Sequence, residues 1–322
     1  MKTPRAEITV NGKPVASAFN DRLISVTIVD KEGATSDTIS CDLNDGMPFA
    51  QIPKKGDEIG AKLGYLETGV ADFGTFIADD PEVLCLPYGM TVNGKGANVR
   101  GKAKQHRSRH WDNKTVKQIV EQIAGENGLS PKVDDEVGSH KYKWFAQQDE
   151  SDLHVVERLA RRHDALFTIK NKTLIFKKKG EGVGSIVASP ANIVEGTCRT
   201  VFAHRYKYKK VKARWQDRNE AKLKEVEEDS DSEGEATYTI AESFQDEGEA
   251  KKAAKAKAKD LKRETMRTSV TLYGDPAVRA GAKFVYAGVR PELDGVEFII
   301  ETAAHKLSKA GYTVDVEAKL KV

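Results

Sequence analysis

Short segments with β-strand patterns fill both ends of this chain, and a shorter stretch with helical periodicity lies between them. In residues 23–29 β-branched side chains dominate, and in residues 36–43 polar and apolar side chains alternate as in a half-buried strand. Strand patterns return from about residue 183. Because several short strands at this spacing form sandwiches or small barrels, we expect a mainly β fold of the α+β class.

The stretch between the β-rich ends is typical of two helices and a hairpin. Residues 115–127 carry apolar side chains at the spacing of one helical face, namely Val116, Ile119, Val120, Ile123 and Ala124. Asp149, with Asp152 three residues later, can cap a second helix. Residues 165–177 then read as a β-hairpin, which completes a small α/β module.

The pattern divides the chain into three predicted domains, a first barrel over residues 1–104, the module over residues 105–178 and a second barrel over residues 179–322. Two segments of the last domain stand out. Residues 220–235 are acidic and poor in apolar side chains, so we predict a mobile loop. Residues 243–264 have a strongly helical composition with a thin stripe of alanine and leucine.

Two distant segments repeat one order of turn and strand signals. In residues 56–77 and in residues 281–299, a glycine precedes an apolar residue that opens a strand, and a later turn glycine leads into another strand. Two unrelated hairpins would give the same signals, since turn chemistry recurs widely. The alternative is two copies of one barrel domain, so that a trimer would present six near-equivalent faces.

Composition argues against several classes of function. The formal net charge of +3 does not point to nucleic acid or membrane surfaces. No apolar run approaches the roughly 18 residues of a membrane span, so we expect no membrane insertion. The N-terminus leads directly into a strand pattern, which argues against a secretion signal. Cys41, Cys85 and Cys198 are scattered, and we predict small buried side chains in a reducing compartment.

No motif of a known enzyme or cofactor site stands in a supporting context, so we predict neither catalysis nor a cofactor. His106 and His110 could share a metal on a helix, but no third ligand is adjacent and a solvated linker is the simpler interpretation. Residues 79–80 and 134–136 are carboxylates on turns, and a glycosidase would need two of them facing across a cleft. His305 could be imagined as a base, and a structural hydrogen-bond donor at the end of a strand is the simpler role.

Residues 204–215 interleave basic and aromatic side chains, as platforms for single-stranded nucleic acid do. The simpler interpretation is a barrel strand whose basic face meets a partner or lines a channel. Tyr206 and Tyr208 share a parity with Lys210 and Lys212, which suggests a bulge or two contacted faces. The candidate partner-contact residues are Tyr206, Lys207, Tyr208, Lys209, Lys210, Lys212 and Arg214.

A set of short motifs runs through the chain in a fixed order. The most informative is residues 147–167, where a glutamine, Glu-Ser-Asp, Arg-Leu-Ala and a final phenylalanine follow one another. The other segments are residues 21–30, 36–37, 56–59, 63–65, 115–129, 272–276, 280–281, 293–295, 305–308 and 311–312. In this order they resemble the late control D family of baseplate hub proteins from contractile-tailed phages. The chain is more distantly similar to the hub region of VgrG, the spike protein of type VI secretion.

The resemblance implies a homotrimer in which each subunit carries two tube-type β-barrel domains and the inserted module, forming a pseudo-sixfold ring. Such a hub is a structural protein of the virion tail baseplate, assembled in the host bacterial cytoplasm. The implied partners are the tail spike protein, the tail tube protein, the tape-measure protein and other baseplate proteins, with possible transient DNA passage through the lumen. Because the chain stops at Val322 without an appended spike, the spike is expected to be a separate polypeptide.

One alternative function rests on the middle module. The helix predicted over residues 115–127, ended by Gly128 and Pro131, resembles half of a LysM-type glycan-binding unit. That likeness implies a phage-encoded peptidoglycan-binding adapter. A helix of this shape is more often plain core.

Overall fold

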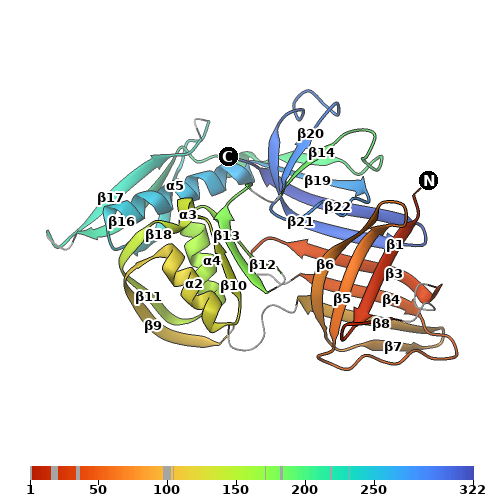
Figure 1. Ribbon diagram of the computed structural model, residues 1–322. Coiled ribbons are helices and arrows are strands. Elements are labelled where there is room, and N and C mark those ends of the chain that lie inside the picture. Colours follow the sequence, from red (N-terminus) through yellow and green to blue (C-terminus); the bar gives the residue numbers. More distant parts are fainter. Residues whose placement is uncertain are drawn as a thin grey trace.

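The computed structural model describes residues 2–15, 21–33, 37–96, 103, 105–170, 172–181, 184–217, 220–231 and 233–322. These residues form three hydrophobic clusters. Figure 1 shows the three parts of the chain that contain them, which are a large β-sheet, a middle module and a small sheet covered by a helix. Ser36, Lys104, Asn171 and Ser232, which belong to predicted segments, lie outside the described residues. Among the helices of the described residues, none is long and apolar enough to span a membrane.

The N-terminal part supplies eight strands to the large sheet. They are β1 (Pro4–Val10), β2 (Lys13–Pro14), β3 (Leu23–Lys31), β4 (Thr38–Asn44), β5 (Glu58–Tyr65), β6 (Gly69–Ala78), β7 (Glu82–Cys85) and β8 (Tyr88–Gly96). The strands predicted at residues 23–29 and 36–43 are confirmed as β3 and β4. Alternate side chains of both strands are buried, as the sequence pattern requires of a strand with one core-facing side.

The C-terminal part supplies six more strands. They are β14 (Ser185–Ala188), β15 (Arg199–Phe202), β19 (Met266–Tyr273), β20 (Lys283–Tyr286), β21 (Glu297–Ser308) and β22 (Gly311–Leu320). Residues 302–308 of β21 pair antiparallel with residues 25–31 of β3. This pairing joins both parts into one 14-stranded sheet, visible where the blue and red strands of Figure 1 meet.

The two halves of the large sheet have the same strand order. If the short strands β2 and β7 are left aside, the first half contains, in chain order, β1, β3, β4, β5, β6 and β8, and the second contains β14, β15, β19, β20, β21 and β22. In space both run second, third, sixth, fifth, fourth, first. Adjacent strands are antiparallel throughout, except that β14 and β20 are parallel where β1 and β5 are antiparallel.

The repeated glycines occupy equivalent turns in the two halves. The Gly56 N–H donates to the Ala78 carbonyl at 3.0 Å, and the Gly281 N–H donates to the Ile300 carbonyl at 2.7 Å. Both glycines have a left-handed backbone, with φ of 96° and 82°, which glycine adopts at little cost. Ala78 and Ile300 therefore stand at the same point of the fifth strand of each half.

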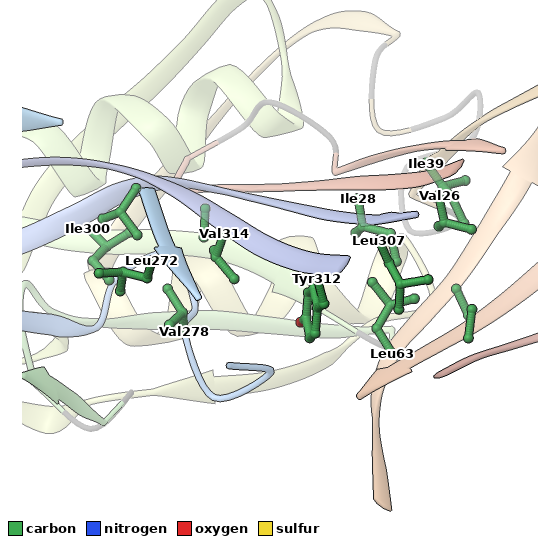
Figure 2. Packing of buried hydrophobic residues seen from close by; sticks show 14 of the residues in the cluster. Val26, Ile28, Ile39, Leu63, Leu272, Val278, Ile300, Leu307, Tyr312 and Val314 are labelled. Atoms are coloured by element: carbon green, nitrogen blue, oxygen red, sulfur yellow. The ribbon is translucent and has the colours of Figure 1, made fainter. Parts of the chain in front are cut away.

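Buried side chains of both halves pack into one core. Figure 2 shows Val26, Ile28, Ile39 and Leu63 of the first half near Leu307 of β21. Leu272, Ile300 and Val314 continue the same cluster into the second half. The β3–β21 junction is thus an apolar contact as well as a backbone pairing.

The middle module has its own core and two small sheets. Its elements are β9 (His106–Thr115), α2 (Val116–Glu126), β10 (Ser130–Val133), α3 (Asp135–Gly138), β11 (Lys141–Ser151), α4 (Asp152–Arg162), β12 (Ala165–Lys170) and β13 (Thr173–Lys178). β9 pairs with β11, and β13 lies between β10 and β12. The predicted helices and hairpin are confirmed, including all five buried residues predicted for α2.

The predicted cap of the second helix was wrong by two residues. Ser151 is the N-cap of α4, and its hydroxyl accepts from the His154 N–H at 3.3 Å. Asp149 lies before the cap with a positive φ of 46°. Asp152 is the first helical residue, where a carboxylate is favoured by the helix dipole.

The third cluster surrounds a long helix. Its elements are η2 (His204–Tyr206), β16 (Lys210–Asp217), β17 (Lys222–Asp229), β18 (Thr237–Phe244) and α5 (Glu247–Glu264). The mobile loop predicted over residues 220–235 was wrong, because half of this segment is the strand β17. The helix predicted from residue 243 begins at Glu247, since Asp246 is the N-cap and the preceding residues belong to β18.

Candidate partner-contact site

Three of the candidate basic residues, Lys210, Lys212 and Arg214, lie on the central strand of the small sheet. β16 is flanked by β17 and β18. Val211 and Ala213 are fully buried and pack into the cluster formed with α5. Lys210, Lys212 and Arg214 alternate with them on the opposite face. The parity conflict noted in the sequence disappears, because the strand begins only at Lys210. Tyr206 belongs to the 3-10 helix η2, and Tyr208 lies in the connection between η2 and the strand.

The acidic strand β17 neutralises this basic face. The Lys210 ammonium lies 2.8 Å from Glu227, and the Lys212 ammonium lies 2.9 Å from Glu225. Hydrogen bonds to these carboxylates raise the pKa of Lys210 and of Lys212. The hydrogen bond from Lys210 in turn lowers the pKa of Glu227. The basic run and the acidic run are therefore partners in one cross-strand ladder of charges.

The aromatic residues of the candidate set do not form an open row of rings. Tyr206 is partly buried, and the Arg267 guanidinium lies 5.5 Å from its ring centre. Tyr208 packs edge-on against Tyr238 at 5.5 Å between ring centres. Lys207 pairs with Glu233, and Lys209 is exposed. A stacking platform for bases needs free aromatic faces, so the arrangement favours the strand interpretation over the nucleic-acid one.

The two candidate metal-binding histidines lie on a strand instead of a helix or linker. His106 and His110 both belong to β9, and residues four apart on a strand are separated by roughly 13 Å. The His106 ring faces Asp149 at 3.6 Å, and the His110 ring faces Asp112 at 3.3 Å. Among the described residues no group of three His, Cys, Asp or Glu side chains could hold a metal.

The carboxylates on turns have structural partners. Asp79 pairs with Lys95 at 2.8 Å, and Asp80 pairs with Lys55 at 3.0 Å. Residues 134–136 form the start of α3, where one carboxylate caps the helix and the others pair with lysines. Their positions follow from local turn and helix geometry.

His305 lies in the contact between the two halves, which we call the seam. Its ring is fully buried, with Nε2 2.9 Å from the Val278 carbonyl and Nδ1 2.7 Å from the Tyr312 hydroxyl. Because a carbonyl can only accept, Nε2 carries the proton and Nδ1 accepts from the tyrosine. Burial lowers the pKa of His305 to about 4, and nearby Arg279 adds to the shift. The ring is therefore a neutral structural bridge, in mid-strand and not at the strand end.

Side chains from both halves converge around this ring. Phe73 of β6 meets His305 edge-on, with 4.6 Å between ring centres. The Arg279 guanidinium lies 3.5 Å from the Phe73 ring centre and donates to the Asp72 carbonyl at 2.9 Å. The Tyr65 hydroxyl donates to the Gly274 carbonyl at 2.9 Å. The seam thus combines backbone pairing, ring packing and hydrogen bonds between segments about 200 residues apart.

Replacing Gly274 by alanine should destabilise the protein by about 1–3 kcal/mol, the usual cost of overpacking. A Cβ at this position would lie 2.2 Å from Cγ of the Tyr312 ring, which is itself held at the seam. The matched control is Gly125→Ala in α2, where nothing lies within 4 Å and alanine favours the helix by up to about 1 kcal/mol. Urea unfolding should give changes of opposite sign, and equal changes would contradict the clash.

A buried charge network in the middle module was not predicted from the sequence. Asp152 is fully buried and pairs with Arg107 and, at 2.9 Å, with Arg109. Gln147 and Asn127 donate to the same carboxylate at 3.0 and 2.9 Å. The glutamine and the aspartate of the motif over residues 147–167 therefore have a structural role. The only available signal was an aspartate at a helix start, which is usually exposed.

β7 and β15 are edge strands of the large sheet and carry exposed apolar side chains. β7 pairs only with β8, and β15 pairs only with β19, among the strands of the described residues. Leu84 and Leu86, in or next to β7, are 53% and 83% exposed, and Val201 and Phe202 of β15 are 44% and 52% exposed. Proteins usually protect edges of this kind, so they are candidates for contact with another chain.

A family model for the phage tail baseplate hub (GPD) matches residues 70–311, which is well over half of the chain. The probable baseplate hub protein of Escherichia phage 186 is 29% identical over 180 residues. The match covers 56% of this chain and 46% of that protein, so the chain spans about half the length of this relative.

Solved structures show the same fold at low identity. The 43 kDa tail protein of prophage MuSo2 from Shewanella oneidensis has a TM-score of 0.72 at 16% identity, over 98% of both chains. The E. coli c3393 protein, a component of the type VI secretion system, has a TM-score of 0.63 at 11% identity, over 98% of this chain and 77% of that one. The predicted distant likeness to type VI secretion proteins is thus confirmed for the fold. As the order of its motifs predicted, the chain belongs to the phage tail baseplate hub (GPD) family and is a component of the virion tail.

Proposed function

We propose that three copies of this chain form a closed ring that joins the sixfold tail tube to the threefold, membrane-puncturing spike. The observation that supports this most is the identical strand order of the two halves of the large sheet. Three subunits with two like halves would offer six near-equivalent faces on one side of the ring and threefold symmetry on the other.

The two halves would be the two tube-type barrels of the predicted architecture, with residues 105–178 as an inserted module. Equivalent turns at Gly56 and Gly281 support a duplicated unit. The separate cores of the large sheet and the middle module support a division near residues 104 and 178.

The proposed role is mechanical. The ring would pass axial force from the tube to the spike during contraction, through β-structure that has few long loops. Its subunit interface would be largely apolar, permanent and above about 2,000 Å². Tape-measure and other baseplate proteins would bind the same hub, DNA would pass through its lumen, and assembly would take place in the host cytoplasm.

The candidate partner-contact residues would then serve the assembly through their exposed parts. Lys209 is exposed, and Lys210, Lys212 and Arg214 lie on the charged face of β16. Because β17 already neutralises most of this face, a partner here would meet a mixed surface of both signs. Such a surface favours a protein partner over nucleic acid.

Mass measurement by light scattering tests the ring directly. The chain has a mass of 35.5 kDa, and we expect a particle of three times that mass, alone or after the spike protein is added. A species that stays monomeric under both conditions would contradict the proposal. Retention on DNA that falls with salt would instead favour a nucleic-acid binder.

The peptidoglycan-binding alternative rests on α2 alone. All five residues of its apolar face are buried in the core of the middle module, which leaves that face unavailable to a glycan. Co-sedimentation with purified peptidoglycan tests this alternative, since an adapter pellets with the polymer and a hub stays in solution.

A further inference from the structure

The pairing of strands at the seam inside one chain indicates how strands of two different chains could pair. At the seam, the fifth strand of the second half, β21, pairs with the second strand of the first half, β3. The second strand of the second half is β15, and its outer edge has no strand partner among the described residues. If the halves alternate around a ring, each β15 edge must meet the fifth-strand edge of a first half.

β7 continues the fifth strand of the first half. Glu82 of β7 is four positions after Ala78 of β6, and their partners on β8 are three positions apart. Ala304 of β21 is likewise four positions after Ile300, and their partners on β22 are also three positions apart. Because Ala78 and Ile300 are equivalent positions of the two halves, β7 is equivalent to the part of β21 that pairs with β3.

β15 of the second half is equivalent to β3 of the first half. A line of paired residues crosses each half, and the two lines are Ala78–Gly94–Ile39–Ile28 and Ile300–Ala318–Thr268–Thr200. Ile28 of β3 and Thr200 of β15 are therefore equivalent. The registers of the whole sheet fix this correspondence without any comparison to another protein.

We propose that β7 of one subunit pairs antiparallel with β15 of the next, repeating the seam between chains. This contact rests on the proposed trimeric ring and names its interface. Transferring the register of residues 302–308 and 25–31 gives the opposed pairs. They are Glu82 with Val201, Val83 with Thr200, Leu84 with Arg199, and Cys85 with Cys198.

The side chains suit this register. Leu307 and Val26 face the core at the seam, so Cys85 and Cys198 share the inner face of the new pair. Cys198 already packs against the large core, whereas Cys85 is exposed in the single subunit. Pairing would cover the exposed apolar side chains of both edges.

The outer face adds a match of opposite charges to this register. Glu82 would lie diagonal to Arg199, where opposite charges attract across antiparallel strands. Each contact uses two different edges, so it is head-to-tail and can close into a ring. Three such contacts leave neither edge uncovered.

A disulfide between engineered cysteines tests the contact. In a Cys85→Ser, Cys198→Ser background, we combine Leu84→Cys with Arg199→Cys and oxidise the assembled protein. Opposed residues on antiparallel strands have Cα atoms about 4.5–5.5 Å apart, within disulfide reach. We expect covalently linked trimers on a denaturing gel, and none from either single substitution.

The register has a matched control. Ala203 lies four residues beyond Arg199 on the same face, roughly 13 Å along the strand, so Leu84→Cys with Ala203→Cys should not cross-link. Circular dichroism checks that each variant is folded. A trimer by light scattering that gives no Leu84–Arg199 cross-link would overturn this contact and leave the proposed function standing. The absence of any trimer would overturn both.

A second pair of variants tests the contact without cysteine chemistry. Val201→Glu would place two carboxylates opposite each other, whereas Val201→Lys would place a lysine opposite Glu82. We expect the trimer of Val201→Glu to dissociate on dilution at about tenfold higher concentration than that of Val201→Lys. Equal dissociation of the two variants, measured by sedimentation, would overturn the proposed register.

Discussion

Replacing Asp152 by alanine should lower the free energy of unfolding by about 3–5 kcal/mol, the usual result of removing one partner of a buried ion pair. The carboxylate is fully buried and connects Arg107 and Arg109 of β9 with Gln147 of β11 and Asn127 at the end of α2. Without it, two guanidinium groups and two amides lose their common acceptor. Part of the loss would be recovered, because both arginines also reach Glu126.

The matched control is Asp135→Ala. Asp135 also sits in the first turn of a helix and pairs with a lysine, but its side chain is 87% exposed. Exposed pairs contribute about 0–1 kcal/mol, so urea unfolding should separate the two variants clearly. Asp152→Asn keeps the shape of the side chain and removes its charge, so its loss in the free energy of unfolding should lie between those of the two alanine variants. A loss at Asp152→Ala as small as at Asp135→Ala would contradict the buried network.

Local patterns predicted the local elements well. The helix α2 and its five buried residues follow from a 3.6-residue period that lies within eleven residues of chain. β3 and β4 were visible for the same reason, since alternation along one strand records which face is buried. The order of the family motifs also predicted the family correctly.

Pairings between distant segments were the source of the errors. Residues 220–235 read as a loop because the composition of a segment does not show what lies opposite it. In the structure, Glu225 and Glu227 pair with the basic strand β16 and supply the neutralising charge. His106 and His110 read as linker because the partner of β9 is β11, some 30 residues further on.

The functional and structural residues described above could be predicted from the sequence only in part. Asp152 carried a helix-start signal, but its burial depends on the arginines of β9, which no local rule connects to it. The repeated turn signals at Gly56 and Gly281 suggested a duplicated unit. The matching strand order was hidden, because β16, β17, β18 and α5 interrupt the second half between its second and third strands.

Lowering the pH from 6.5 to 4 should lower the free energy of unfolding, because of His305 at the seam. The pKa of His305 is lowered to about 4 in the folded state, against 6.5 for an unperturbed histidine. In this pH window the unfolded chain binds a proton that the folded chain does not. Stability therefore falls as the pH falls, and by linkage this single group accounts for about 3 kcal/mol once the pH is below 4.

His305→Gln removes the titrating ring and should flatten the pH dependence of the unfolding free energy by about one proton within that window. The titratable and charged groups that face the ring are Tyr312, Arg279 and Asp30, and the substitution leaves them in the protein. His163, whose pKa burial lowers to about 3, keeps its own acid dependence in the variant. Substituting the exposed His106 is the control and should leave the slope unchanged. If His305→Gln and wild type lose stability in parallel from pH 6.5 to pH 4, the ring at the seam is not the neutral bridge described above.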